Sequence, residues 1–419
     1  MKKIILIFAL TLSGLSNAAS AQTWTRYDIF SGLPDGNVKV AIDANGNKWI
    51  GMLVNAGFGG VAKFNGTFTS YNSGLPDNNV FGITIDGSGV KWAATYGGLA
   101  QFNGVGWTAY TTSNSSLPDN VVSAITIDGS GNKWVATYGG GLAKFDDTNW
   151  TVYNRANSGI SSDSVWCVTI DASGNKWIGT DRGVSEFDGT NWTNYNPSNS
   201  GLLSYAVTAI AIDASGNKWF GNRNSSNQGL VKFDGINWTL YNTSNSSLPN
   251  NKIECIIMDG SGNKLIGTTN GLAKFDGVKW TLYNSPVTAD NDIQSVAIDA
   301  SGNMWVGTAA SLSKISVSLS VNEINAGNLI SISPNPFSTS ATLVIASATK
   351  QSLNNIKVVF YDVLGRRHEI ASSAKSGIAM TANGTAEIKI DKGNLTEGMY
   401  FYDIRSENGM LGAGKIIIE

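Results

Sequence analysis

The sequence predicts an all-β protein: a seven-bladed β-propeller of four-stranded blades, followed by a small, Ig-like C-terminal β-sandwich. Three observations predict this fold class. A seven-residue motif occurs seven times, at intervals of 40–46 residues. Each interval holds four short β-rich runs separated by turn residues, as in a propeller blade. A different β pattern begins after Val317.

The repeated motif reads DASGNKW at Asp171, and its copies begin at Asp43, Asp86, Asp128, Asp213, Asp259 and Asp299. A calcium loop and a structural turn are the two interpretations. Calcium takes about six to eight oxygen ligands, often from several carboxylates, and each copy offers one Asp. We therefore expect a hairpin turn that the Asp caps and in which the Gly has a positive φ.

The two ends of the repeat array predict a closed ring. The array opens with a lone outer strand at residues 24–28 and ends with three strands, the last at residues 311–317. We infer that these two segments pair, so that residues 22–317 form one propeller. An open array would need capping repeats instead.

Twelve of the thirteen Trp residues fall at two repeat positions, six on second strands and six at the start of fourth strands. Leu265 and Phe68 occupy these positions in the remaining copies. A buried Trp contributes on the order of 4–6 kcal/mol before entropy. Packing between blades is the favoured interpretation, and a stacking platform for sugars is the alternative.

Composition and the N-terminus bear on compartment and partners. A formal net charge of -2 over 419 residues predicts no nucleic-acid partner. Residues 1–21 have the cationic start, short apolar run and Ala-Ser-Ala site of a signal peptide. No later apolar run reaches the roughly 20 residues of a membrane span. We expect a monomer, exported through the inner membrane and then secreted or attached to the outer-membrane surface.

The sequence offers little catalytic chemistry, so we expect no cofactor, no metal and no catalytic residue. The single His, His368, lies in the C-terminal region. A glycan-active enzyme could work with two carboxylates alone, and Glu254 is the clearest acid outside the repeat pattern. Cys167 and Cys255 fall in different blades, which predicts two free thiols.

The loops between second and third strands deviate most from the repeat, at residues 52–60, 180–183 and 222–229. Such loops usually carry function, here at the mouth of the propeller channel. The sequence predicts ligand contacts at Trp166, Phe81, Glu254, Tyr96, Tyr138, Arg182, Tyr205 and Arg223. We expect a non-catalytic module that binds a glycan, peptide or protein. The alternatives are an enzyme, a structural or adhesion protein, and variable surface positions that bind nothing.

The stretch LPDNVVSAITIDGSGNKWVATYGGGLAKF, from Leu117 to Phe145, resembles the two-component regulator propeller repeat. That family is best known from the periplasmic sensing part of hybrid histidine kinases in Bacteroidota. This chain has no predicted membrane helix and no kinase part, and about half the usual number of repeats. The resemblance therefore implies a free-standing propeller.

After a polar linker at residues 318–329, residues 330–419 resemble the type A sorting domain of the type IX secretion system. The positions that match its motifs are Pro334, Asn335, Pro336, Asp362, Gly365, Gly398, Tyr400 and Lys415. The resemblance implies recognition by an outer-membrane translocon, then removal of the domain and surface anchoring or release. The alternative is a carbohydrate-binding sandwich. We expect residues 366–368 to form a solvated turn.

Overall fold

The structure is a computed structural model that describes residues 22–28, 33, 36–53, 59–222, 229–283, 291–317, 328–333, 340–347, 357–362, 367–369, 385–391, 395–406 and 409–418. The chain divides into two compact units at residues 316–317. No helix with the length and apolar character of a membrane span occurs in this part of the chain.

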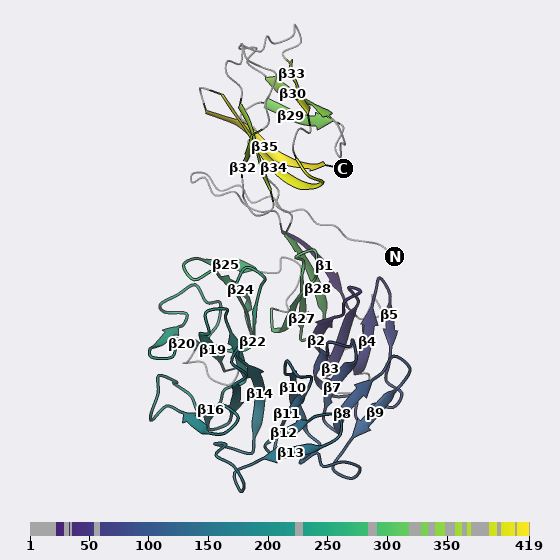
Figure 1. Cartoon of the computed structure of the whole chain (residues 1–419), viewed down its shortest axis with the longest axis vertical. Coiled ribbons are helices and arrows are strands. Elements are labelled where there is room, and N and C mark those ends of the chain that lie inside the picture. The colour runs from purple at the N-terminus through teal and green to yellow at the C-terminus, as the bar shows by residue number, and fades with distance from the viewer. Residues whose placement is uncertain are drawn as a thin grey trace. The chain divides into compact units, whose positions relative to one another are not determined.

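The first unit is a seven-bladed β-propeller, which confirms the predicted fold class; its described residues form seven four-stranded sheets. The first strands contact those of neighbouring blades and so surround a common axis (Figure 1). In blade order they are β2 (Asn37–Ile42), β6 (Val80–Ile85), β10 (Val122–Ile127), β14 (Val165–Ile170), β18 (Ala209–Ile212), β22 (Ile253–Met258) and β26 (Ile293–Ile298).

The remaining strands follow outward in each blade. The second strands are β3 (Lys48–Leu53), β7 (Lys91–Thr95), β11 (Lys133–Thr137), β15 (Lys176–Thr180), β19 (Lys218–Gly221), β23 (Lys264–Thr268) and β27 (Met304–Thr308). The third strands are β4 (Gly60–Phe64), β8 (Gly98–Phe102), β12 (Leu142–Phe145), β16 (Gly183–Phe187), β20 (Leu230–Phe233), β24 (Gly271–Phe275) and β28 (Leu312–Val317). The fourth strands of blades 1–6 are β5 (Phe68–Ser70), β9 (Trp107–Tyr110), β13 (Trp150–Tyr153), β17 (Trp192–Tyr195), β21 (Trp238–Tyr241) and β25 (Trp280–Tyr283).

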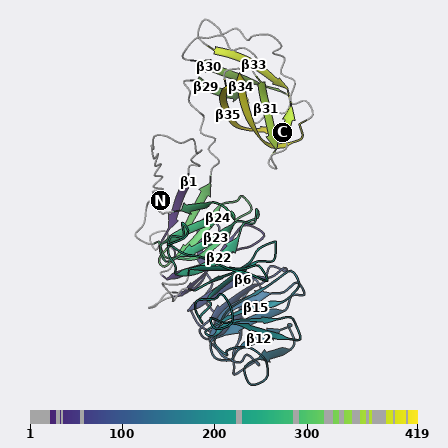
Figure 2. The same ribbon diagram turned by 90° about the vertical axis from the view of Figure 1, so that its left-hand side faces the viewer.

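The seventh blade takes its fourth strand from the start of the chain. Strand β1 (Gln22–Tyr27) lies beside β28 and completes the sheet β1-β28-β27-β26 (Figures 1 and 2). Tyr27 of β1 also contacts Phe64 of blade 1, with 4.6 Å between ring centroids. Strand β1 therefore joins the last blade through the sheet and contacts the first blade through side-chain packing.

The repeated motif forms the hairpin between first and second strands, as blade 5 shows. Asp213 Oδ1 accepts the backbone N–H groups of Ser215 and Asn217, each at 3.0 Å. Gly216 has a φ of 80°, and a Cβ added there would have no atom within 4 Å, so its backbone conformation alone favours glycine. Both carboxylate oxygens accept hydrogen bonds within the motif, which supports the turn interpretation.

The Asp has a second partner that the sequence did not predict. Its Oδ2 accepts the indole Nε1–H of the second-strand Trp at 2.9–3.2 Å in six blades. The six pairs are Asp43–Trp49, Asp86–Trp92, Asp128–Trp134, Asp171–Trp177, Asp213–Trp219 and Asp299–Trp305. Each of these Trp residues is at most 3 % exposed, so the turn supplies the hydrogen bond that a buried indole needs.

The Lys of the motif contacts the Trp of the preceding blade. Its Nζ lies 4.2–5.1 Å from the ring centroid, within the range of a cation–π interaction. The pairs are Lys48–Trp305, Lys91–Trp49, Lys133–Trp92, Lys176–Trp134, Lys218–Trp177 and Lys264–Trp219. One motif therefore links its own turn, its own second strand and the neighbouring blade.

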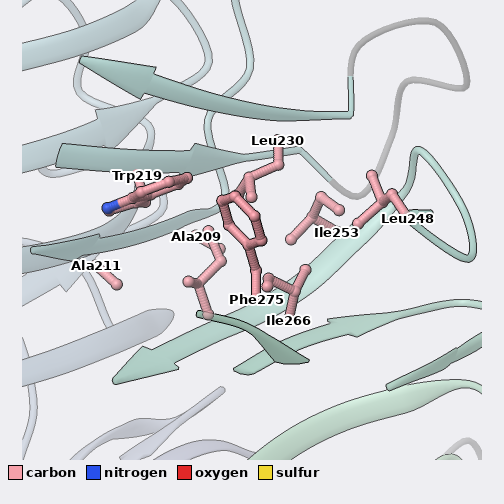
Figure 3. Packing of buried hydrophobic residues seen from close by; sticks show 9 residues of the cluster. Ala209, Ala211, Trp219, Leu230, Leu248, Ile253, Ile266 and Phe275 are labelled. Atoms are coloured by element: carbon pink, nitrogen blue, oxygen red, sulfur yellow. The ribbon is translucent and has the colours of Figure 1, made fainter. Parts of the chain in front are cut away.

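The third-strand Phe fills the space beside the same Trp. Figure 3 shows Trp219 of blade 5 beside Phe275 of blade 6, with Leu230 and Ile253 in the same buried cluster. The Trp219 and Phe275 rings meet edge to face at a centroid distance of 6.1 Å. These contacts support the prediction that the repeated Trp residues pack between blades.

The junction between blades 6 and 7 is built differently. Leu265 takes the Trp position of blade 6, while Met304 and Ile315 take the Lys and Phe positions of blade 7. All three are buried in one cluster. Asp259, whose blade has no indole, accepts Lys274 Nζ at 2.9 Å instead. Losing one Trp thus accompanies changes in each of its partners.

The second unit is a small β domain with two antiparallel sheets. One contains β29 (Asn328–Ser333), β30 (Ser340–Ser347) and β33 (Thr385–Asp391), and the other β32 (Arg367–Glu369), β31 (Lys357–Asp362), β34 (Gly398–Ser406) and β35 (Gly409–Ile418). Strand β29 begins two residues inside the predicted linker. The solvated turn expected at residues 366–368 is wrong for 367–368, because Arg367 and His368 lie in β32. The His368 ring contacts Tyr400 edge to face at 5.6 Å.

We predict that Asp213→Asn lowers the free energy of unfolding by about 1–3 kcal/mol at pH 7, because an amide replaces a carboxylate that accepts several hydrogen bonds, one of them from the buried Trp219. Burial raises the pKa of Asp213, but hydrogen bonds from Asn217 and Trp219 and the charge of Lys264 outweigh it, so the pKa lies below its ordinary value. A lowered pKa stabilises the fold above about pH 4, and this contribution disappears as the pH falls through the folded value.

The deficit in unfolding free energy of Asp213→Asn, relative to the unaltered chain, should therefore be smaller at acidic pH. Urea unfolding followed by Trp fluorescence at pH 7 and pH 3.5 measures it. Asp181→Asn is the matched control, because Asp181 is exposed. A deficit of equal size at both pH values would contradict the proposed role of the carboxylate.

The junction between blades 6 and 7 gives a second prediction. Leu265→Trp overpacks a buried site and Met304→Lys buries a cation, so each alone should cost about 1–3 kcal/mol. The double variant recreates the Lys-on-Trp contact. Its cost should therefore be smaller than the sum of the two single costs, by about 0.5 kcal/mol or more. A double-mutant cycle by urea unfolding measures this coupling. Additive costs would show that the two positions are independent.

Candidate functional site

Five of the described first strands contain a β-bulge at the same position, just after the first register pair. The residues left between register pairs are Phe81, Ser123, Trp166, Glu254 and Gln294. A bulge turns one side chain out of the regular alternation of the strand. These five residues lie where the first strands begin, and we call this end of the propeller the bulge rim.

Three of the predicted ligand contacts, Phe81, Trp166 and Glu254, are therefore equivalent bulge residues. A predicted Tyr lies beside each of the first two. Tyr96 and Tyr138 follow the second strands of blades 2 and 3. Phe81 contacts Tyr96 at a centroid distance of 6.4 Å, and Trp166 meets Tyr138 edge to face at 5.1 Å. Tyr96 is 56 % exposed and Tyr138 is 49 % exposed, so two aromatic pairs face solvent on neighbouring blades.

The other predicted contacts lie farther along the same rim. Arg182 is exposed on the turn after β15, where Thr180 Oγ1 accepts its backbone N–H. Tyr205 is exposed on the connection that precedes blade 5. No ring contact between Tyr205 and either aromatic pair occurs among the described residues. Arg223 lies outside those residues.

The opposite part of the rim is polar, and sequence reasoning found only Glu254 there. Lys39 Nζ donates to Gln294 at 2.8 Å from the backbone oxygen and 3.4 Å from Oε1. Gln294 Nε2 donates in turn to Asp292 Oδ1 at 2.9 Å. A spacing signal could have revealed the bulge: Val or Ile stands six residues before the motif Asp in blades 2–7, but five before it in blade 1.

The indole Nε1–H of Trp166 is buried and donates to no other described residue. This differs from the second-strand Trp residues, whose Nε1–H groups are paired with Asp. A buried donor without an acceptor costs about 1–3 kcal/mol. Trp166 therefore keeps a hydrogen-bond donor that no described residue accepts.

In the described part of the chain, no group of three or more His, Cys, Asp or Glu side chains has the arrangement of a metal site. Most repeat carboxylates are engaged in turns, like Asp188, whose Oδ1 accepts two backbone N–H groups. The described bulge rim offers stacking through its aromatic pairs and hydrogen bonding through Lys39 and Gln294.

The described residues that match the sorting motif lie on three neighbouring strands of the C-terminal domain, β31, β34 and β35. Asp362 pairs with Tyr400, and Tyr400 pairs with Ile416. Gly398 begins β34 with a φ of 146°, and Lys415 pairs with Phe401. Tyr400 is buried and its hydroxyl donates to Thr396 O at 3.1 Å. Pro334, Asn335, Pro336 and Gly365 lie outside the described residues.

The fold and these sites define a protein in which a seven-bladed propeller precedes a small β domain. Residues 331–419 match the secretion system C-terminal sorting domain, and residues 289–310 match the two component regulator propeller. The chain therefore carries two component regulator propeller repeats and a type IX sorting domain, as predicted. No curated protein matches it.

Solved structures share the fold at low sequence identity. The extracellular domain of a proposed hybrid two component system from B. thetaiotaomicron has a TM-score of 0.61 and 19 % identity, covering 96 % of this chain and 58 % of that one. Virginiamycin B lyase from Staphylococcus aureus has a TM-score of 0.59 and 14 % identity, covering 71 % and 100 %. PorZ, an essential surface component of the type IX secretion system of Porphyromonas gingivalis, has a TM-score of 0.54 and 17 % identity, covering 92 % and 59 %.

The two cysteines give a prediction for the first strands. Both are free thiols, and burial raises the pKa of Cys167 to about 12 and that of Cys255 to about 11. At pH 8 the thiolate fraction should be on the order of 100- to 1,000-fold below that of an unperturbed Cys. Ellman's reagent should therefore react slowly with the native protein and label two thiols in guanidinium. Rapid native labelling would contradict this burial.

Proposed function

We propose that the protein is a non-catalytic binding module that holds a glycan, peptide or protein partner at the bulge rim. The observation that carries this proposal is the bulge itself, which turns Phe81 and Trp166 out of their strands beside the half-exposed rings of Tyr96 and Tyr138. Aromatic groups of this kind contribute much of the energy in binding surfaces. They are separate from the Trp residues that hold the blades together.

The sorting domain indicates export by type IX secretion to the cell surface or the outside. We extend this to a route: residues 1–21 direct the chain across the inner membrane, and the translocon recognises residues 330–419. Removal of that domain would leave a monomeric propeller, secreted or attached to the outer surface. The likeness to PorZ, at 17 % identity, concerns the fold alone.

The likeness to virginiamycin B lyase does not carry an activity to this chain, because 14 % identity supports the fold alone. The single His of the sequence, His368, lies in the C-terminal domain. Enzymatic glycan cleavage would need two acids about 5–10 Å apart. Glu254 is the acid among the five bulge residues, and the two aromatic pairs beside Phe81 and Trp166 favour binding over such chemistry.

A glycan array and a peptide library, probed with the chain from Gln22 onward, test this proposal. We expect binding without turnover, and at least tenfold weaker binding by Trp166→Ala. Val278→Ala is the matched control, since Val278 is 92 % exposed on an outer hairpin and should bind like the unaltered chain. Cleavage that Glu254→Gln abolishes would establish the enzyme instead. Binding by neither library would favour a structural or adhesion role.

A further inference from the structure

A groove with a volume of about 650 Å³ lies at the outer edge of the propeller, between blades 5 and 6. Blade 5 lines it with Tyr241 and with residues 244–247 of the connection that follows β21. Blade 6 lines it with Phe275, Trp280 and the hairpin residues 277–278. These residues are distinct from those of the bulge rim, so the groove is a second candidate site.

One residue of the connection determines how closely the loop approaches the Trp that begins the fourth strand of the next blade. After blades 3 and 4 this residue is Gly159 and Gly201, where an added Cβ would come within 2.6 and 2.2 Å of the Cβ of that Trp. Only glycine therefore lets the loop lie directly against the Trp. After blade 5 the equivalent residue is Ser247, so the loop must lie farther from Trp280, and the groove is found beside this ring.

The Trp280 indole is a firmly held platform in the groove. It stacks on Phe275, with ring centroids 4.5 Å apart and an interplanar angle of 15°, and the Tyr241 ring lies 6.1 Å away. Trp280 nevertheless stays partly exposed. Its Nε1–H donates to no described residue, whereas that of the equivalent Trp107 donates to Tyr71 O at 2.7 Å. Trp280 therefore combines a rigid aromatic surface with a donor that no described residue accepts.

The polar groups of the groove are uncharged. The Ser247 hydroxyl is exposed and forms no hydrogen bond with the described residues. Ser244 Oγ donates to Asn242 Oδ1 at 3.0 Å, which orients the hydroxyl and leaves its lone pairs as acceptors. None of the described lining residues has a charged side chain. Val278 adjoins them but is 92 % exposed, so most of its side chain faces solvent rather than the groove.

We propose that this groove binds a neutral sugar unit of a glycan. A sugar ring has an apolar face of C–H groups and a rim of hydroxyls, so it can pack on the Trp280 indole and exchange hydrogen bonds with Ser247 and Ser244. A charged ligand would find no counter-charge among the described lining residues, and a purely apolar one would leave polar groups unpaired. This inference goes beyond the proposed function, because it places a second ligand outside the bulge rim.

An array of neutral and anionic glycans, probed with the chain from Gln22 onward, tests the inference. Isothermal titration calorimetry then gives the affinity for each neutral oligosaccharide that binds on the array. Trp280→Leu removes the aromatic surface and should weaken this binding about tenfold or more. Ser247→Ala keeps the Cβ that holds the loop away from the Trp but removes the hydroxyl, and should weaken binding about fivefold.

Ser116→Ala is the matched control, because Ser116 has the same place in the connection that follows blade 2. There Asp147 takes the position of Gly277 in the facing hairpin, so the lining is not the same. This variant should bind like the unaltered chain. Equal urea midpoints show that the variants fold, and Ser247→Ala decides alone if Trp280→Leu does not fold.

Trp166→Ala separates the groove from the bulge rim. A neutral glycan whose binding is weakened by Ser247→Ala but not by Trp166→Ala supports the groove site. Unchanged affinity of Ser247→Ala for every glycan would overturn the inference, as would binding confined to anionic glycans. A glycan lost with Trp166→Ala alone would overturn the groove site and support the proposed function. If no glycan binds, the groove inference fails, and the peptide library alone decides the proposed function.

Discussion

The indole of the second-strand Trp is the group on which the propeller depends. Its Nε1–H donates to the Asp of its own hairpin, and its face carries the Lys of the next blade. One buried side chain therefore fixes a turn and an interface together. Because Lys48 of blade 1 lies over Trp305 of blade 7, the same interaction also crosses the point where the two ends of the array meet.

This dependence explains why the repeats do not vary independently. Stability in a repeat protein combines the stability of each unit with terms from neighbouring units. Where Leu265 replaces the Trp, a Lys above it would lose its ring and stay buried, and Met304 stands there instead. The carboxylate of Asp259 would lose its indole donor, and Lys274 supplies another. The exception follows the same physical rule as the six regular junctions.

The blades could be predicted from sequence because their signal is repeated: a period of 40–46 residues, four β runs and turn residues at fixed places. The Asp–Trp hydrogen bond could not, because sequence spacing alone does not show that a hairpin brings Oδ2 to an indole six residues away. The bulge was also missed. It adds one residue to a strand without changing its composition, although Val38 stands closer to its motif Asp than Val80 does.

Trp166 and Phe81 were recognised as unusual because they depart from the repeat, and the bulge gives the physical reason. A residue outside the register takes no part in the contacts between Asp, Trp and Lys, so the fold places few demands on it. Carboxylates follow the same division: those of the motif are held by the turn and the indole, whereas Asp77 and Asp119 each leave one oxygen unused by the described residues. Groups that the packing leaves uncommitted are the ones that can meet a ligand, and the indole Nε1–H of Trp166 is one of them.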